Sequence, residues 1–92
     1  MPKGPNYYGH AGNIDRVWDK AAPIRGIDAS LMRVDSARQP ILRSAYGTSG
    51  AGGWEIDHIK PKSKNGSDYI RNLQPLNTHT NRSYGNRGGK PH

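Results

Sequence analysis

Apolar residues recur at helical spacing near the start of the chain, across residues 14–22. Four of them fall on one face, at positions i, i+3, i+4 and i+7: Ile14, Val17, Trp18 and Ala21. This spacing predicts a short amphipathic helix that packs one side against a core. Asn13 precedes it as the expected N-terminal cap, and Pro23 follows it where a helix must stop.

The middle of the chain carries weaker signals. A second helical turn is expected after Asp28, with Asp28 or Ser30 as its cap. Residues 40–46 (PILRSAY) are expected to form a short strand. The glycine-rich stretch 47–53 (GTSGAGG) is expected to be a flexible connector.

A sharper pattern begins at Trp54, where the stretch WEIDHI alternates apolar and polar residues. Alternation of this kind predicts a half-buried strand. The following residues, 60–67 (KPKSKNGS), predict a loop, in which Asn65-Gly66 is the strongest turn signal. A second strand is expected at 72–76 (NLQPL), at a sheet edge because Pro75 cannot donate to a ladder.

A short helix is expected to complete this pattern, through the residues THTNRSY. Asn77 or Thr78 would cap its start, and Gly85-Asn86 would end it. The expected fold is a single α+β domain whose C-terminal half is a strand–loop–strand–helix motif, supported by the short N-terminal helices. Its expected organisation is a flexible arm over 1–13, a helical and irregular support region over 14–53, the motif over 54–87 and a flexible tail over 88–92.

Composition narrows the class of protein. The 92 residues include 12 Gly, 7 Pro and no Phe, as in a small, loop-rich domain. The absence of cysteine excludes disulfides and thiolate zinc sites, so no structural zinc is expected. No apolar run approaches the roughly twenty residues of a membrane span, and the first residues do not resemble a signal peptide. We expect a soluble, cytoplasmic protein with no membrane partner, with a secreted effector as the alternative.

Positive charge is concentrated in the last third of the chain. Lys and Arg outnumber Asp and Glu by 14 to 7. From Lys60 to His92 there are seven basic residues and one acidic residue, Asp68. Such a basic region attracts nucleic acid through its phosphates without specifying a sequence.

The segment WEIDHIKPKSKNGSDYIRNLQPLNTHTNR resembles the HNH, or ββα-metal, endonuclease family. Asp57 and His58 close its first strand, Asn72 lies 14 positions after His58, and Asn81 lies nine positions further on. The spacing is similar to an H-N-N variant that also occurs in the nuclease domain of some RNA-guided DNA-cutting enzymes. The resemblance implies hydrolysis of DNA phosphodiesters to products with a 5′-phosphate and a 3′-hydroxyl.

The residue types fit that chemistry. His58 is the expected general base, because the pKa of imidazole lies near neutral pH. Asp57 and Asn81 are the expected ligands of one divalent cation, Mg²⁺ with Mn²⁺ as the alternative, because both offer hard oxygen atoms. Asn72 is expected to assist catalysis by tying the loop and orienting His58.

Basic side chains around this site are expected to contact DNA phosphates. They are Arg82, Lys60, Lys62 and Lys64. Tyr84 stands where many members of the family carry Lys, so a phosphate contact of that kind is not expected there. Recognition is expected to be directed mainly at the backbone, because nothing in the sequence indicates a base-reading helix or a zinc finger.

Two neighbouring residues offer alternatives. His79 would restore a literal H-N-H, but two helical steps of about 100° place it on nearly the opposite face from Asn81. Glu55 is expected to form a structural salt bridge, with Arg33 or Arg43, rather than to serve the metal site.

Two other functions remain as alternatives: a DNA-binding module that keeps the fold without catalysis, and an RNase that uses the same site. The biological role is left open among phage DNA processing, restriction and antibacterial toxicity. An antibacterial toxin would need an immunity protein as its partner.

Overall fold

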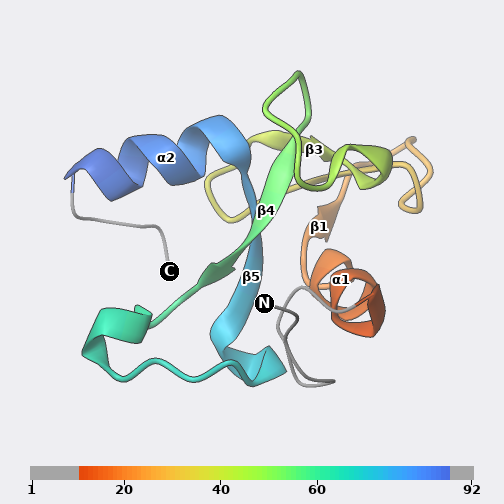
Figure 1. Cartoon of the computed structure of the whole chain (residues 1–92). Coiled ribbons are helices and arrows are strands. Elements are labelled where there is room, and N and C mark those ends of the chain that lie inside the picture. Colours follow the sequence, from red (N-terminus) through yellow and green to blue (C-terminus); the bar gives the residue numbers. More distant parts are fainter. Residues whose placement is uncertain (1–10, 88–92) are drawn as a thin grey trace.

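The computed structural model describes the backbone of residues 11–87 and the side chains of residues 13–83. Strands β4 (Trp54–His58) and β5 (Leu73–Asn77) form an antiparallel hairpin in the middle of the molecule. Helix α1 (Ala11–Trp18) lies on one side of this hairpin and helix α2 (Thr78–Arg87) on the other, as Figure 1 shows. The predicted α+β fold is confirmed.

The core lies between α1 and the face of the hairpin that carries Trp54. Its buried members come from both halves of the chain: Val17, Trp18, Ala21, Ile41, Trp54, Ile56 and Leu73. The ring of Trp54 lies 5.3 Å from that of Trp18 and 4.9 Å from that of Tyr46, centroid to centroid. In a chain without phenylalanine, these three aromatic rings supply much of the apolar packing in the core.

The support region contains a sheet that the sequence did not reveal. Strands β1 (Ala22–Pro23), β2 (Met32–Val34) and β3 (Pro40–Leu42) pair antiparallel in chain order. Each strand has two or three residues, which is too short for apolar and polar positions to alternate recognisably. The strand expected at 40–46 thus ends at Leu42, and a 3-10 turn, Arg43–Ala45, follows it.

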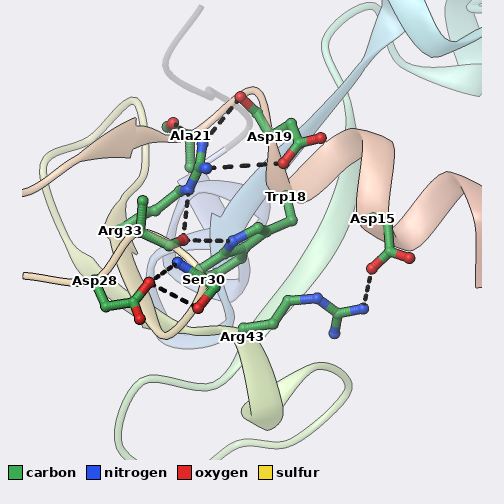
Figure 2. Close-up of polar contacts among 9 residues, drawn as sticks. Asp15, Trp18, Asp19, Ala21, Asp28, Ser30, Arg33 and Arg43 are labelled. Carbon is green, nitrogen blue, oxygen red and sulfur yellow. Dashed lines mark hydrogen bonds and ion pairs between the residues drawn. The ribbon is translucent and has the colours of Figure 1, made fainter.

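Arginine side chains fasten α1 to the support region. The guanidinium of Arg33 donates to the carbonyl oxygens of Asp19, Ala21 and Ala29, and it lies 5.8 Å from the Trp18 ring centroid. Figure 2 shows the side chain of Arg33 close to Ala21, Asp19 and Trp18, beside the end of α1. A planar group with five donors is well suited to satisfy several carbonyls at once.

The start of α2 is anchored to the support region by Asp35, which is buried. Its Oδ1 accepts from the backbone N–H groups of Ala37 and Gln39, and its Oδ2 accepts from that of Asn77 at 2.8 Å. Asn77 in turn caps α2, because its Oδ1 accepts from the backbone N–H groups of His79 and Thr80. The capping prediction for Asn77 is confirmed, and the support region fixes where α2 begins.

Several predicted boundaries are wrong by a few residues. Helix α1 begins at Ala11, inside the expected arm, so Asn13 lies in the helix rather than at its cap. Helix α2 continues through Gly85 to Arg87, because a glycine inside a helix costs only about 1 kcal/mol. The second strand starts at Leu73, since Asn72 ends a 3-10 turn.

The rest of the expected organisation stays a prediction. Residues 1–10 and 88–92, where the flexible arm and tail were expected, lie outside the described residues. Asp28 begins a short turn, as expected: its side chain accepts from the backbone N–H and the hydroxyl of Ser30. Within residues 11–87, no helix is long and apolar enough to cross a lipid bilayer.

Candidate active site

Asp57 is a buried carboxylate near the end of β4, with 3% of its surface exposed. The strand register places it opposite Gln74, whose Nε2 donates to Asp57 Oδ2 at 3.0 Å. Ser36 donates its hydroxyl to Gln74 Oε1 at 3.0 Å, which keeps the amide turned toward the carboxylate. A buried carboxylate is costly unless hydrogen bonds compensate its charge, and the Gln74 amide supplies one such bond.

Asn81 lies in the first turn of α2, beside the same face of the hairpin. Its Nδ2 donates to Glu55 Oε1 at 3.1 Å, and Glu55 shares the side of β4 that carries Asp57 because side chains alternate along a strand. Because Nδ2 of Asn81 faces Glu55, the amide oxygen Oδ1 points away from it. The structure therefore gathers Glu55, Asp57, Gln74 and Asn81 on one face.

His58 ends β4 and meets the loop that follows. Its Nε2 lies 2.7 Å from Asp68 Oδ1, and Lys62 Nζ lies 3.1 Å from the other oxygen, Oδ2. The hydrogen bond with His58 is the main reason that the pKa of Asp68 lies below its ordinary value, although desolvation opposes it. The ion pair of Asp68 therefore stabilises the fold above the ordinary carboxyl pKa, and this contribution disappears as the pH falls through the lowered value.

Asn72 ties the two ends of the β4–β5 loop together. Its Oδ1 accepts from the backbone N–H of Lys60 at 2.8 Å, and its Nδ2 donates to the carbonyls of Lys60 and Ser67. The backbone N–H of Ile59 donates to the Asn72 carbonyl at 2.8 Å. These bonds fit the loop-tying role expected of Asn72, and they hold the chain directly after His58.

The turn expected at Asn65-Gly66 is also present. Asn65 adopts a left-handed conformation with φ 65°, which asparagine tolerates better than most residues. A Cβ on Gly66 would lie 1.8 Å from the Lys60 carbonyl oxygen, so only glycine fits there. A tight crossing of the loop over itself explains this glycine.

The basic residues expected to contact DNA lie on the surface around the site. Lys60, Lys62 and Lys64 project from the loop and are exposed, while Lys62 also pairs with Asp68. Arg82 is exposed and lies 3.9 Å from Glu55 Oε2. The expected salt bridge of Glu55 thus forms with a different partner.

Arg33 and Arg43, the partners expected for Glu55, lie too far from it to form the predicted salt bridge. Arg33 pairs with Asp19, and Arg43 pairs with Asp15, both beside α1 (Figure 2). Glu55 lies on the opposite face of the hairpin, under α2, where Asn81 and Arg82 contact it. The prediction that Arg33 or Arg43 pairs with Glu55 is wrong.

The two candidates on α2 differ in their surroundings. His79 is exposed, whereas Asn81 is half-buried and directed at β4. Both facts agree with the helical geometry that separates the two residues by about 200°. Tyr84, the third position considered there, has a side chain outside those the structure describes.

Sequence reasoning missed three residues of the site: Asp68, Gln74 and Glu55 as the partner of Asn81. Asp68 was the single acidic residue in a basic segment, which is a signal that could have marked it. Gln74 could have been found from the strand register, because Asp57 and Gln74 are directly opposed once β4 and β5 are aligned.

The donor atoms fit a hard divalent cation. Among the described residues, no three His, Asp or Glu side chains cluster as a ready metal-binding group. One buried carboxylate and one amide oxygen provide few protein ligands, which suits Mg²⁺ because it retains several waters. The residues at hand, Asp57 and Asn81, are therefore compatible with such an ion and incompatible with a thiolate zinc site.

Comparisons with known proteins give one match. A family model described as HNH endonuclease matches residues 47–87. No curated protein and no solved structure matches the chain. The matched residues include β4, β5 and α2, together with Asp57, His58, Asn72 and Asn81, and they begin ahead of the expected motif boundary at residue 54. Residues 47–87 are thus similar to the HNH endonuclease family, which indicates the role of a nuclease or a DNA-binding protein.

Proposed function

We propose that the chain is a metal-dependent endonuclease that hydrolyses DNA phosphodiesters. The observation that carries this proposal is the pairing of His58 with Asp68 at the end of β4, the strand that also carries the buried carboxylate of Asp57. A DNA-binding module needs neither an oriented imidazole nor a buried carboxylate. Hydrolysis of an unreactive anionic ester needs both a base and a cation.

His58 acts as the general base in this mechanism. Asp68 Oδ1 accepts a hydrogen bond from Nε2–H, which favours the neutral tautomer that is protonated on Nε2. The imidazole then takes a proton from the attacking water, while Asp68 stabilises the imidazolium that forms. Lys62 balances the charge of Asp68, so that the carboxylate does not repel the phosphate.

Asp57 and Asn81 would hold one divalent cation, which proteins of this family generally use. Such an ion supplies positive charge against the negative charge that develops on the phosphate oxygens. Gln74 holds one oxygen of Asp57, and Glu55 holds the amide nitrogen of Asn81. Both partners orient the donors, and Asn72 keeps the chain next to His58 in place.

The experiment that tests this function compares substrates. Purified protein with Mg²⁺ is incubated with supercoiled plasmid and, separately, with a structured RNA. We expect nicked and linear plasmid, with 5′-phosphate ends that a ligase accepts, and little cleavage of RNA. Binding without cleavage would identify a DNA-binding module, and cleavage of RNA alone would identify an RNase.

Asn81→Ala should raise the Mg²⁺ concentration needed for half-maximal cleavage, because it removes a neutral oxygen ligand. We expect an increase of roughly tenfold or more, the loss that ligand-shell changes typically cause. Asn81→Asp should retain part of the activity with an altered preference between Mg²⁺ and Mn²⁺. A metal titration of plasmid cleavage measures both effects.

His79→Ala is the matched control on the same helix turn and should titrate like the unmodified protein. An increased Mg²⁺ requirement in His79→Ala, with none in Asn81→Ala, would show that the assignment of the helix ligand is wrong.

Asp68→Ala should lower kcat by roughly 10- to 100-fold with little change in KM, because His58 loses the group that orients it. The kcat of Asp68→Asn should lie between those of Asp68→Ala and the unmodified protein, since an amide oxygen still accepts a hydrogen bond from Nε2. The ¹⁵N chemical shifts of the imidazole supply a second measurement. They should report the Nε2–H tautomer in the unmodified protein and a mixture of tautomers in Asp68→Ala.

Asp28→Ala is the control for Asp68. It removes another exposed carboxylate with a lowered pKa, bonded to Ser30 far from the hairpin. Unchanged imidazole shifts in Asp68→Ala, or an equal effect of Asp28→Ala on kcat, would contradict the positioning role.

Replacing Lys60, Lys62 and Lys64 together by Gln should weaken DNA binding and its dependence on salt. The log–log slope of affinity against salt should flatten by up to about one unit for each phosphate that these lysines neutralise. Fluorescence anisotropy of a labelled duplex in EDTA measures this slope. A variant with Arg16 and Arg25 changed to Gln is the control, because both are exposed and lie outside the motif. Equal slopes for all three proteins would mean that the lysines are only solvated.

A further inference from the structure

The loop next to His58 displays an exposed aromatic side chain. Tyr69 is 67% exposed, whereas the residue after it, Ile70, packs against the core. The guanidinium carbon of Arg71 lies 5.2 Å from the centroid of the Tyr69 ring. An arginine at this distance covers one face of the ring and helps to order it, and it leaves the other face for a further partner.

The backbone beneath this pair is fixed from outside the motif. Lys20, which follows α1, donates its ammonium group to the carbonyl of Ile70 at 2.7 Å and to the carbonyl of Leu73. The two acceptors belong to the first residue of the 3-10 turn that carries Arg71 and to the residue directly after that turn. Partial burial beside these carbonyls lowers the pKa of Lys20. Tyr69 and Arg71 therefore project from a rigid base.

The pair also lies next to the proposed general base and within a basic loop. Tyr69 directly follows Asp68, whose carboxylate meets His58 Nε2 at 2.7 Å. The loop before it carries three exposed lysines, at positions 60, 62 and 64. A ligand held by Tyr69 and Arg71 would therefore need both a flat ring system and a negative charge.

We infer that Tyr69 and Arg71 form a stacking platform for an unpaired nucleotide beside the phosphate to be cleaved. A nucleobase stacks on the open face of the tyrosine ring, and the adjoining phosphates meet Arg71 and the lysines. Bases inside a duplex have both faces covered by their neighbours, so only a single-stranded, flapped or frayed nucleotide can use the platform. The inference rests on the proposed nuclease function, and it predicts that the enzyme prefers DNA with unpaired nucleotides near the cut.

The test measures binding without catalysis. The full chain in EDTA is titrated into three fluorescein-labelled probes of about 12 nucleotides: a single-stranded DNA, the same sequence as RNA, and a blunt DNA duplex. Tyr69→Ala should weaken binding to the single-stranded DNA roughly tenfold and leave duplex binding within about twofold. Tyr69→Phe should bind like the unmodified protein. The RNA probe decides whether the platform accepts both kinds of strand.

A second measurement reports stacking directly. A single-stranded DNA with 2-aminopurine should lose fluorescence on binding the unmodified protein, and it should lose less on binding Tyr69→Ala. Leu31→Ala is the control, because Leu31 is 62% exposed and lies in the support region. Arg71→Ala should weaken binding to all three probes, because Arg71, like the lysines, contacts phosphates. Arg25→Ala is its matching control.

Two results would overturn the platform. In one, Tyr69→Ala binds single strands as the unmodified protein does, so that the pair with Arg71 is only an intramolecular contact. In the other, Tyr69→Ala weakens single-strand and duplex binding equally. These outcomes are separate from failure of the nuclease proposal, because binding is read in EDTA and cleavage is read with Mg²⁺.

Discussion

His58→Ala should lower the rate of plasmid cleavage by about 10²- to 10⁴-fold while DNA affinity stays within about twofold. A general base acts on the proton that moves in the transition state, and it contributes little to binding of the ground state. The structure supports this division of roles, because His58 Nε2 is engaged by Asp68 rather than exposed for a phosphate. Single-turnover cleavage and anisotropy in EDTA measure the rate and the affinity separately.

His79→Ala is the control for this experiment, since it removes an exposed histidine from the same motif and should leave both quantities unchanged. Melting temperatures of the two variants show whether each protein still folds. Parallel loss of binding and cleavage in a folded His58→Ala protein would indicate a structural histidine. Retained cleavage would remove His58 from the mechanism.

Trp54→Ala should reduce the free energy of unfolding by about 3–5 kcal/mol, the range for removing a buried aromatic side chain. Trp54 is 0% exposed and contacts the rings of Trp18 and Tyr46. It is also the first residue of β4, so its removal loosens the strand that carries Asp57 and His58. Urea unfolding followed by circular dichroism measures the change.

Trp54→Phe separates packing from hydrogen bonding at the same position. Among the described residues, the indole Nε1 of Trp54 has no hydrogen-bond partner. Phenylalanine retains most of the ring contacts and removes an unpaired buried donor, so the decrease in stability should be much smaller than in Trp54→Ala. Equal decreases in the two variants would show that the indole nitrogen makes an essential contact. The exposed Leu31→Ala variant should leave stability nearly unchanged.

The motif could be predicted from the sequence because its signals are local. Alternation from Trp54 onward predicted β4, and the Asn65-Gly66 turn and the spacing of His58, Asn72 and Asn81 predicted the order of elements. The family match over residues 47–87 confirms the resemblance to HNH endonucleases that the sequence motif indicated. Helical geometry alone distinguished His79 from Asn81, and their different exposures agree with it.

The supporting contacts could not be predicted, because they join residues that lie far apart in the chain. Asp35 reaches the backbone of Asn77, and Lys20 reaches the carbonyls of Ile70 and Leu73. Neither residue has a local pattern that marks it, and the two- or three-residue strands around Asp35 have no periodicity to detect. The partner of Glu55 was misassigned for the same reason, since charge alone does not tell which face of a strand a distant arginine shares.

The measurement that tests the central claim most directly is plasmid cleavage by metal-free protein to which Mg²⁺ is returned. We expect no cleavage in excess EDTA, and activity restored by Mg²⁺ or Mn²⁺, because Asp57 and Asn81 supply oxygen ligands and the chain has no thiolate. The loss of activity in His58→Ala, about 10²- to 10⁴-fold, should not be recovered at any concentration of Mg²⁺. Full cleavage by the unmodified protein in excess chelator would contradict the metal-dependent mechanism.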